Sequence, residues 1–329
     1  MKILITGGAG FIGSHLIEKL YLEHEVTVID NLSTGHIENI HPFIEKISFH
    51  NFDLFLGNKK KLDEIIQGTE VVFHLAALAD IVPSMQYPEK YYNSNVTGTF
   101  NLLQAMVRNK IPKIIYSASS SCYGIPDKFP TDELAEERPQ YPYALTKLLG
   151  EKLIFHWSNL YNFNCNSLRL FNVYGTRSRT SGTYGAMFGV FLAQKLANQS
   201  LTVVGNGEQT RDFTYVSDVA DAFISVGFSN INNQIFNIGS GETVSINRIV
   251  DLLKCKSTFI PKRPGEPDCT FADINKIKSS TKWTPKISIE KGISFLLDDI
   301  DYWKDAPVWT PSSIEKETKD WFKYLGKAK

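Results

Sequence analysis

Tyr143 and Lys147 stand four residues apart in a segment, 143–160, whose apolar residues recur at helical intervals. Residues four apart share one face of a helix, so the phenol and the ammonium would lie together. A phenol is a poor base at neutral pH unless a nearby cation stabilises its phenolate. With a hydroxyl from the serine-rich stretch 117–121, this pair indicates proton transfer to and from a substrate hydroxyl. The alternative is a chance pair on an exposed helix face.

A glycine-rich turn follows the first apolar segment of the chain. Gly7 and Gly10 would allow a tight turn and bring backbone amides to a pyrophosphate, and Gly13 would let the next helix pack closely. Asp30 ends a second apolar segment, where its carboxylate can accept hydrogen bonds from an adenosine ribose and would repel a 2′-phosphate. The pattern favours NAD over NADP as the cofactor. The alternative is an ordinary strand-to-helix turn and a surface aspartate.

Helices and strands must position these candidate residues. Along the chain, apolar β-rich segments alternate with segments whose apolar residues recur at helical intervals. Continuous apolar runs such as Ile3-Leu4-Ile5 are typical of strands buried on both faces, so we expect a doubly wound parallel sheet between helices, a Rossmann fold. Asp53 and Leu54 would end the third strand, where the carboxylate could meet an adenine amino group or simply form a turn. The expected strands are 2–6, 25–30, 47–54, 70–77, 113–120 and 165–174, and the expected helices are 14–22, 59–67, 89–109 and 143–160.

The pattern loosens after residue 175, with glycine- and serine-rich turns at 181–185, 205–207 and 239–241 and a proline-rich piece at 261–267. We expect residues 1–175 to form an NAD-binding domain to which about 210–240 returns. Residues 176–329 would mainly form a smaller C-terminal α/β lobe that binds substrate, together with a helical tail. An amphipathic helix over 312–325 would dock on the body through Trp321, Phe322 and Leu325.

The composition of the chain limits the kinds of partner that it is expected to bind. The 35 basic and 35 acidic residues leave no net charge, so no global field draws the chain to nucleic acid or to an anionic membrane. Four scattered cysteines form no C-x-x-C pair, which predicts a reducing, cytoplasmic setting with neither a structural metal nor disulfides. The first residues lack the features of a signal peptide, and the longest apolar run, 71–78, is too short to span a bilayer. We expect a small-molecule substrate.

Several further motifs occur in a fixed order along the chain. With them the sequence resembles the extended short-chain dehydrogenase/reductase family of NAD-dependent nucleotide-sugar epimerases and dehydratases, from Met1 to about Pro285. Within that family it is most similar to the UDP-glucose and UDP-N-acetylglucosamine 4-epimerases. The resemblance implies a UDP-sugar substrate and a homodimer paired through the helices at 89–109 and 143–160. The motifs are His74-Leu-Ala-Ala77, Asn95-Val-Thr-Gly-Thr99, Ser119-Ser-Ser-Cys-Tyr-Gly124, Arg169-Leu-Phe-Asn-Val-Tyr-Gly175 and Arg211-Asp-Phe-Thr-Tyr-Val216.

The resemblance also implies roles for individual residues. The catalytic group would be Ser119, Tyr143 and Lys147, with the last two also touching the cofactor. The other cofactor-binding positions would be Gly7, Gly10, Phe11, Ile12, Gly13, Asp30, Asn31, Asp53, Leu54, Ala76 and Asn95. The substrate-binding positions would be Ser84, Ser120, Asn172, Val203, Arg211, Arg263, Glu266 and Thr270.

The residues after Ser119 separate the chemistries of the family. The 4,6-dehydratases carry Asp-Glu there and the decarboxylases keep the Glu, but this chain has Ser120 and Ser121, which cannot act as general acids at neutral pH. In the sequence, Cys122 stands one residue away from the position at which the 3,5-epimerases carry a cysteine. We therefore expect the Cys122 side chain to be buried and to serve only in packing. Of the reactions known for the family, the one that remains is epimerisation at C4 of the sugar, through a transient 4-keto intermediate. At the position that gates the sugar pocket, small Thr270 would admit plain and N-acetylated hexoses.

Other functions stay open. One group of alternatives comprises other nucleotide-sugar enzymes: a UDP-glucuronate 4-epimerase, a 4-keto reductase or a 4,6-dehydratase. A non-catalytic NAD-sensing regulator on the same fold is another, although such proteins typically lose the Tyr or the Lys, and both are present here.

Overall fold

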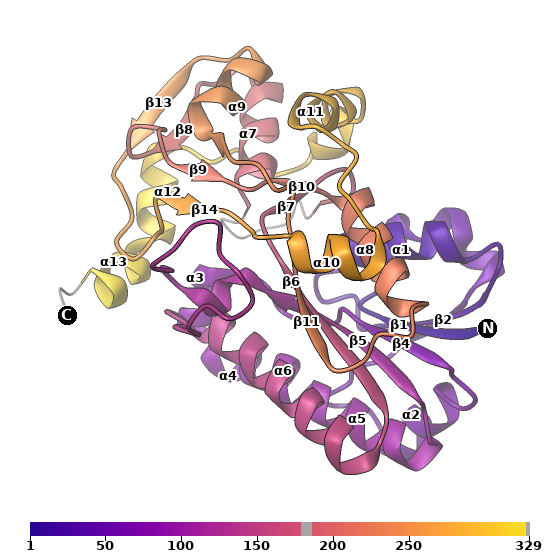
Figure 1. The fold of residues 1–329 in the computed structure, drawn as a ribbon. Coiled ribbons are helices and arrows are strands. Elements are labelled where there is room, and N and C mark those ends of the chain that lie inside the picture. The colour runs from indigo at the N-terminus through magenta and orange to yellow at the C-terminus, as the bar shows by residue number, and fades with distance from the viewer. Residues whose placement is uncertain (179–185, 327–329) are drawn as a thin grey trace.

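A seven-stranded, all-parallel sheet forms the centre of the molecule in the computed structural model, which describes residues 1–178 and 186–326 (Figure 1). The strand order is β11-β6-β5-β4-β1-β2-β3, and every neighbouring pair is parallel. This confirms the predicted doubly wound fold. The strands are β1 (Lys2–Thr6), β2 (Glu25–Asp30), β3 (Ser48–Asn51), β4 (Val71–His74), β5 (Lys113–Ser119), β6 (Asn164–Leu170) and β11 (Gln234–Ile238).

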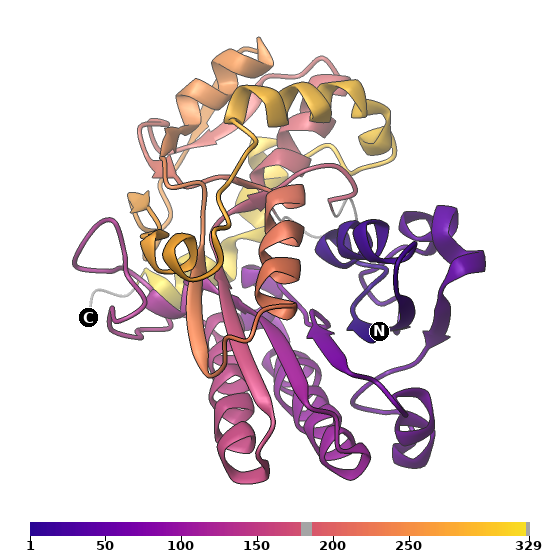
Figure 2. The ribbon, with the colours of Figure 1, turned by 45° about the vertical axis from the view of Figure 1, so that its right-hand side comes forward.

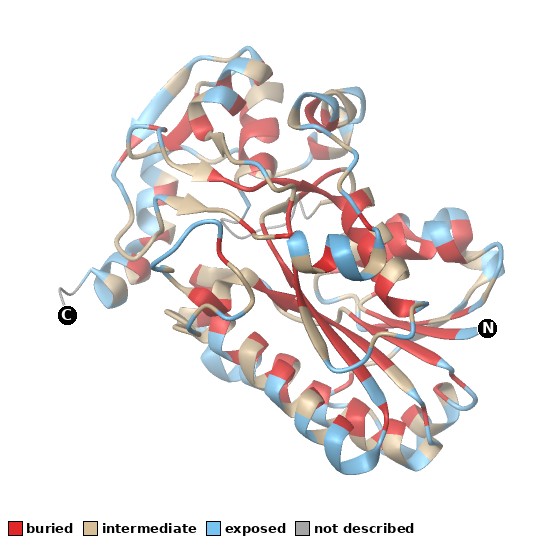
Figure 3. Ribbon diagram, in the orientation of Figure 1, coloured by how far each residue is buried: buried red, intermediate tan, exposed pale blue. Residues whose placement is uncertain are grey.

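The central strands are buried on both faces, because helices cover each side of the sheet. All four residues of β4 are buried, and the strands of the sheet are largely coloured as buried in Figure 3. In Figures 1 and 2, α1 (Phe11–Leu20) and α8 (Val216–Gly227) lie on one face, and α2 (Lys59–Ile65), α5 (Gly98–Asn109) and α6 (Pro142–Tyr161) lie on the other. The strand order reverses between β1 and β4, and such a reversal opens a crevice at the carboxyl ends of the strands.

A smaller α/β lobe stands over that end of the sheet (Figure 1). It has its own hydrophobic cluster, in which Trp303 is fully buried. We propose a boundary near residue 175, with α8 and β11 returning to the large sheet. The elements of the lobe are α7 (Met187–Leu196), β8 (Leu201–Val204), β9 (Thr210–Arg211), β12 (Val244–Ser245), α9 (Ile246–Leu253), β13 (Ser257–Ile260), β14 (Cys269–Thr270) and α11 (Ile289–Asp298).

Shorter elements connect these two parts. The pair β7 (Val173–Tyr174) and β10 (Thr214–Tyr215) forms a separate parallel ribbon between sheet and lobe. The remaining helices are α3 (Ile81–Gln86), α4 (Pro88–Tyr92), α10 (Asn275–Thr281), α12 (Pro311–Glu317) and α13 (Lys319–Leu325).

Several expected elements differ from the structure. β4 ends at His74 and not at residue 77, and the strand expected over 165–174 is divided into β6 and β7. The third strand ends at Asn51, so Asp53 and Leu54 lie in the loop beyond it. The helix expected over 89–109 is interrupted by a π-helical turn at Asn93–Thr97. The tail forms two short helices, α12 and α13, and Phe322 is 40% exposed, while Trp321 is buried as expected. The turn expected at 181–185 lies outside the described residues.

Candidate active site

One large pocket opens at the carboxyl ends of the sheet strands. Its volume is about 1170 Å³, above the roughly 300–1,000 Å³ of a pocket that holds one small ligand. The segments that follow β1 to β6 line it, together with the first turns of α1 and α6 and several residues of the lobe. It therefore has room for two ligands side by side, one against the glycine turn and one beneath the lobe.

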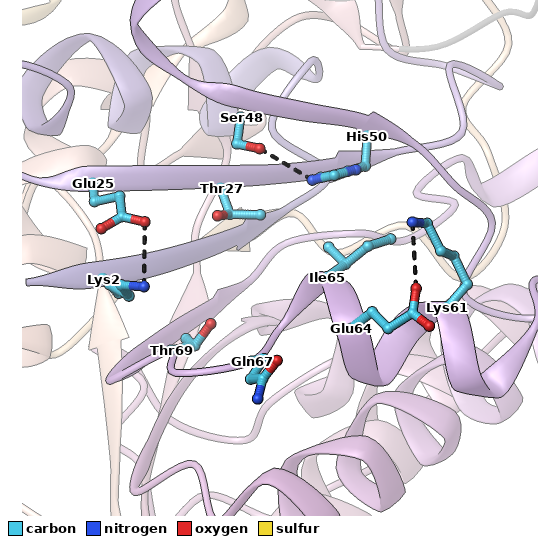
Figure 4. Close-up of a pocket in the computed structure, with 10 residues that line it drawn as sticks. All are labelled: Lys2, Glu25, Thr27, Ser48, His50, Lys61, Glu64, Ile65, Gln67 and Thr69. Carbon is cyan, nitrogen blue, oxygen red and sulfur yellow. Dashed lines mark hydrogen bonds and ion pairs between the residues drawn. The ribbon is translucent and has the colours of Figure 1, made fainter.

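A second, smaller pocket of about 260 Å³ lies at the opposite, amino ends of β1, β2 and β3 (Figure 4). The charged side chains in its wall pair with one another: Lys2 Nζ lies 3.5 Å from Glu25 Oε1, and Lys61 Nζ lies 3.5 Å from Glu64 Oε2. Figure 4 shows none of the candidate catalytic residues in this wall. It is a polar surface hollow, separate from the site described here.

The glycine turn between β1 and α1 is tight because two parts of the backbone meet there. Gly7 has φ +72°, and a Cβ at Gly7 would lie 2.7 Å from the backbone N of Ala76, which follows β4. A Cβ at Gly13 would lie 2.3 Å from the carbonyl O of Gly7. Side chains at these two positions would push the turn away from the helix and from the neighbouring strand.

The start of α1 and the end of β2 fit the two ends of a dinucleotide. No side chain caps α1, whose N-cap is Gly10, so its first amides remain available to an anion. The Asp30 carboxylate accepts hydrogen bonds from Ala9 N at 3.0 Å and Leu32 N at 2.8 Å. Burial raises the pKa of Asp30, and these two amide donors oppose that shift. An anion-binding turn beside a ribose-binding carboxylate is what NAD requires, so the residues fit this cofactor.

Ser119, Tyr143 and Lys147 converge on the floor of the large pocket. Ser119 ends β5, and Tyr143 and Lys147 lie on the first two turns of α6. The Ser119 hydroxyl lies close enough to the Tyr143 phenol to lower the pKa of that phenol. Lys147 is only 4% exposed, and its Nζ lies 4.5 Å from the centre of the Tyr116 ring. Two hydroxyls and an ammonium therefore meet at one place in the pocket.

Burial controls the protonation of this group. It raises the pKa of Tyr143, with smaller contributions in the same direction from Asp80 and Cys122, while the hydrogen bond from Ser119 lowers that pKa. The sequence led us to expect a phenolate stabilised by nearby positive charge. In the folded chain by itself, the desolvation of the Tyr143 ring sets the direction of the shift, and the sequence alone does not reveal desolvation. An oxidised nicotinamide, when bound, would add a second positive charge to that of Lys147.

Burial shifts the pKa of Lys147 in the opposite direction to that of Tyr143. Burial lowers its pKa from 10.5 to about 7, and the carboxylate of Glu151, one helical turn further on, opposes the shift. Below about pH 7 the folded chain carries this buried charge and is destabilised by it. Between about pH 7 and 10.5 the unfolded state keeps a proton that the folded state has lost, so this destabilisation fades as the pH rises.

Lys147→Met should therefore change how stability depends on pH. Relative to this variant, the free energy of unfolding of the unsubstituted chain should rise by about 1.4 kcal/mol per pH unit above about pH 7. Urea unfolding of both chains, freed of NAD, at a series of pH values measures the difference. The control is Lys60→Met, at an exposed lysine of α2, which should run parallel to the unsubstituted chain. A constant offset between the Lys147→Met variant and the unsubstituted chain would contradict the assigned pKa.

At the lobe side of the pocket, one carboxylate joins two arginines. Arg211 Nη2 lies 2.9 Å from Glu266 Oε1, and Arg263 Nη1 lies 3.8 Å from Glu266 Oε2. That Oε2 atom is buried, and no hydrogen-bond donor reaches it within the described part of the chain. This end of the pocket carries a net positive charge and a free acceptor, which suits a phosphate group attached to a hydroxyl-bearing sugar.

Thr270 and Asn172 form a hydrogen-bonded pair in the same wall. Thr270 Oγ1 donates to Asn172 Oδ1 at 2.7 Å, and Asn172 has a positive φ of +26°. The small threonine side chain is thus held in place by the residue that follows β6 and Phe171. Nothing bulky occupies this position.

Most of the residues singled out from the sequence line the large pocket, but three do not. Ser84 is fully buried and donates to the carbonyl of Ile81 at 2.6 Å. Asn95 is buried, and its amide bonds to Leu78 and Thr146. Val203 is buried within the lobe. The residues that do line it are Gly7, Gly10, Phe11, Ile12, Gly13, Asp30, Asn31, Asp53, Leu54, Ala76, Ser119, Ser120, Tyr143, Lys147, Asn172, Arg211, Arg263, Glu266 and Thr270.

The structure shows the turn role that was left open for Asp53 and a different backbone setting for Cys122. Asp53 accepts hydrogen bonds from Phe55 N at 2.7 Å, Leu56 N at 2.9 Å and Asn31 Nδ2 at 2.7 Å, so its carboxylate shapes the loop after β3. Cys122 lies in a 3₁₀ turn, not on a strand, so strand alternation does not orient it. It is nonetheless buried, and burial raises its pKa to about 12, which leaves a protonated thiol at neutral pH.

Several aromatic residues of the pocket wall were not predicted from the sequence, and two of them, Tyr141 and Trp321, contact the candidate catalytic and anion-binding residues. Tyr141 stacks on Tyr143, with ring centres 6.4 Å apart and planes 7° apart. Pro142 is a signal that could have found it, because proline at the first helical position places the preceding residue at the N-cap. Trp321 was expected only to dock the tail, yet it lines the pocket.

The described residues contain neither a membrane-spanning helix nor a cluster of side chains that could bind a metal ion. In the ranges 1–178 and 186–326, no helix is both long and apolar enough to cross a membrane. The same ranges contain no cluster of three or more His, Cys, Asp or Glu side chains that could hold a metal ion.

Comparison with known proteins extends this picture. Residues 3–239 match the model of the NAD dependent epimerase/dehydratase family. A putative UDP-glucose 4-epimerase of Methanocaldococcus jannaschii is 39% identical over 301 residues, which cover 88% of this chain and 95% of that protein.

Two solved structures are similar along almost their whole length. The UDP-N-acetylglucosamine 4-epimerase of Methanobrevibacter ruminantium, in complex with UDP-N-acetylmuramic acid, has a TM-score of 0.84 and 32% identity, covering 91% of this chain and 98% of its own. The UDP-glucuronic acid 4-epimerase of Bacillus cereus, with UDP-glucuronic acid and NAD, has a TM-score of 0.85 and 32% identity, covering 92% and 99%. With the glycine turn and the fit to NAD, these matches show that the chain belongs to the NAD-dependent epimerase/dehydratase family, as its sequence predicts.

Proposed function

We propose that this enzyme inverts C4 of a UDP-hexose, interconverting UDP-GlcNAc with UDP-GalNAc, UDP-Glc with UDP-Gal, or both. The observation that carries the proposal is the convergence of Ser119, Tyr143 and Lys147 in the same pocket as the glycine turn. Tyr143 takes the proton of the C4 hydroxyl and later returns it, and Ser119 shares that proton. The charged form of Lys147 stabilises the phenolate. NAD, when bound, supplies an acceptor for two electrons that can give the same two electrons back.

The opposite end of the pocket supports the inversion step. Arg211, Arg263 and Asn172 are the candidate anchors for the diphosphate and its nucleoside, with Glu266 as an acceptor for a ribose hydroxyl. If that end is held, the 4-keto hexose can turn over in the pocket and expose its other face without leaving the enzyme. Binding energy from the unreacting nucleotide is thereby used at the reacting carbon.

The sugar wall favours a hexose of either kind. Thr270 leaves space where an aromatic side chain would exclude an N-acetyl group, and its hydrogen bond to Asn172 keeps it against the wall. Ser120 and Ser121 stand where a dehydratase needs acidic groups, and the Cys122 thiol is protonated and buried. These features argue against elimination and against epimerisation by a cysteine. The relative that binds UDP-glucuronic acid keeps a UDP-glucuronate 4-epimerase as the second candidate.

The test is a comparison of three substrates. The purified protein is incubated separately with UDP-GlcNAc, UDP-Glc and UDP-GlcA, and the nucleotide sugars are separated by chromatography. We expect the C4 epimer of UDP-GlcNAc or UDP-Glc to appear without net consumption of a reduced nicotinamide. A product from UDP-GlcA alone would favour the second candidate, stoichiometric loss of NAD(P)H would identify a reductase, and no product from any of the three would favour a non-catalytic regulator.

We also propose that the chain forms a homodimer through α5 and α6. Phe100 of α5 and Trp157 and Tyr161 of α6 form an aromatic cluster across these two helices, and Phe100 and Tyr161 are 36% and 45% exposed. Sedimentation should give twice the chain mass of 37.1 kDa, and Phe100→Glu should shift it toward the monomer, since a charge buried in an apolar interface is costly. A monomer from the unsubstituted chain at micromolar concentration would refute the proposed dimer.

A further inference from the structure

The C-terminal tail reaches back to the large pocket. Four residues of the tail line that pocket, although they follow the last strand of the lobe by several dozen residues: Ala306, Pro307, Trp309 and Trp321. Two buried side chains anchor the tail: Ile314 of α12 is 2% exposed, and Gln194 of α7 donates to the carbonyl of Trp309 at 2.7 Å. Figure 1 shows α13 close to α3, with which it is in contact. The tail is therefore a fixed part of the pocket wall.

Trp321 contacts the segment that carries Arg263 and Glu266. Its indole Nε1 donates to the carbonyl of Pro264 at 2.7 Å, and the guanidinium of Arg263 lies 5.5 Å from the centre of its ring. Trp321 is only 4% exposed, so both interactions are shielded from water. One side chain thus holds the backbone of this segment and the charge that the segment presents.

Neighbouring contacts restrict the same segment further. Gly265 has φ +72°, and a Cβ there would lie 3.7 Å from Leu325 Cβ, so Leu325 packs directly on this turn. On its other side, the Trp321 ring lies 6.3 Å from the ring of Tyr141, which stacks on Tyr143. The tryptophan therefore connects the anion-binding end of the pocket to the tyrosine pair at the reacting end.

We propose that the tail is part of the nucleotide-sugar site and that Trp321 is a positioning residue, which holds Arg263 and Glu266 in the geometry that binds the diphosphate and ribose. This inference rests on the proposed UDP-sugar substrate. Without the indole, the 263–266 turn loses a hydrogen bond and its arginine loses an aromatic face, so the anion-binding groups must be ordered each time a ligand binds. The loss should fall mainly on nucleotide binding, because Trp321 contacts the 263–266 turn directly and reaches Tyr143 only through the ring of Tyr141.

The test uses three variants and UDP as the probe. Trp321→Ala removes both interactions, and Trp321→Phe keeps a ring beside Arg263 but no N–H donor. Phe322→Ala is the matched control, since it removes the next aromatic residue of α13, which is 40% exposed and lies outside the pocket lining. Calorimetry gives the Kd for UDP, steady-state kinetics on the accepted UDP-sugar give KM and kcat, and the NAD content of each purified protein reports an intact cofactor domain.

We expect Trp321→Ala to raise the Kd for UDP and the KM about 10- to 100-fold while kcat and NAD content stay close to those of the unsubstituted enzyme. Trp321→Phe should recover part of the loss, and Phe322→Ala should behave as the unsubstituted enzyme. Equal UDP binding by Trp321→Ala would overturn the inference alone. So would a fall in kcat and NAD content in both Trp321 variants, since that pattern means a general folding defect. If the unsubstituted, NAD-loaded enzyme bound no UDP, the proposed function would fall as well.

Discussion

Tyr143→Phe is expected to lower kcat for C4 epimerisation by roughly 10²- to 10⁴-fold, the usual contribution of a positioned proton-transfer group. The substitution removes the hydroxyl that interacts with Ser119 and keeps the ring that stacks on Tyr141. The candidate anchors of the nucleotide lie elsewhere in the pocket, so the Kd for UDP should change little. Product formation under saturating substrate and calorimetry with UDP measure the two quantities separately.

Tyr123→Phe provides the control for losing a buried tyrosine hydroxyl. Its phenol donates to Asn237 Oδ1 at 2.7 Å and takes no part in the pocket wall. This variant should lose about 1 kcal/mol of stability through the broken hydrogen bond and keep its activity. If Tyr143→Phe epimerised its substrate at close to the normal rate, Tyr143 would not be the group that moves the proton.

Gly7→Ala should strip the protein of NAD. The new Cβ would lie 2.7 to 2.9 Å from three backbone atoms of Leu75 and Ala76, none of which can rotate away, and φ +72° is itself unfavourable for alanine. Relief requires the turn after β1 to separate from the loop after β4, and that turn forms the candidate pyrophosphate site. We expect the NAD released from each purified chain by denaturation to fall to a small fraction of the normal amount.

Gly68→Ala separates the steric effect from the conformational cost. Gly68 also has a positive φ, +78°, but a Cβ there would meet only the flexible side chain of Lys2, at 3.6 Å. Alanine at a positive φ should lower the stability of both variants by a similar amount, of order 1 kcal/mol. Only Gly7→Ala should also deform the cofactor turn. Equal NAD content in the two variants would mean that the turn does not hold the cofactor.

Six of the seven strands of the sheet were predicted, most clearly those with continuous apolar runs such as β1 and β4, whereas β11 was not predicted as a strand. The first two strands were predicted with the bounds that the structure has, Lys2–Thr6 and Glu25–Asp30. Errors arose where tertiary contacts override the local pattern. The π-helical turn at Asn93–Thr97 interrupts an otherwise regular helical period, and Thr318 separates two tail helices that share one amphipathic pattern.

The sequence predicted which residues meet in the candidate site, but it did not predict how burial shifts their pKa values. Tyr143, Lys147 and Ser119 could be paired from spacing and resemblance, and they do meet in one pocket. The direction of the Tyr143 pKa shift could not be predicted, because it depends on how completely the fold removes water from the ring. Trp321 could be predicted to be buried, but its contact with the Arg263 turn joins segments more than fifty residues apart, which no local pattern records.

The place of β11 in the sheet limits how this protein can be divided. β11 pairs with β6 along Gln234–Ile238, although the chain builds much of the lobe between these two strands. A polypeptide cut near residue 175 would therefore leave β6 with a bare row of amides and carbonyls, which is a template for aggregation. Separate expression of a cofactor-binding half is thus expected to give insoluble material unless the return segment is grafted back on.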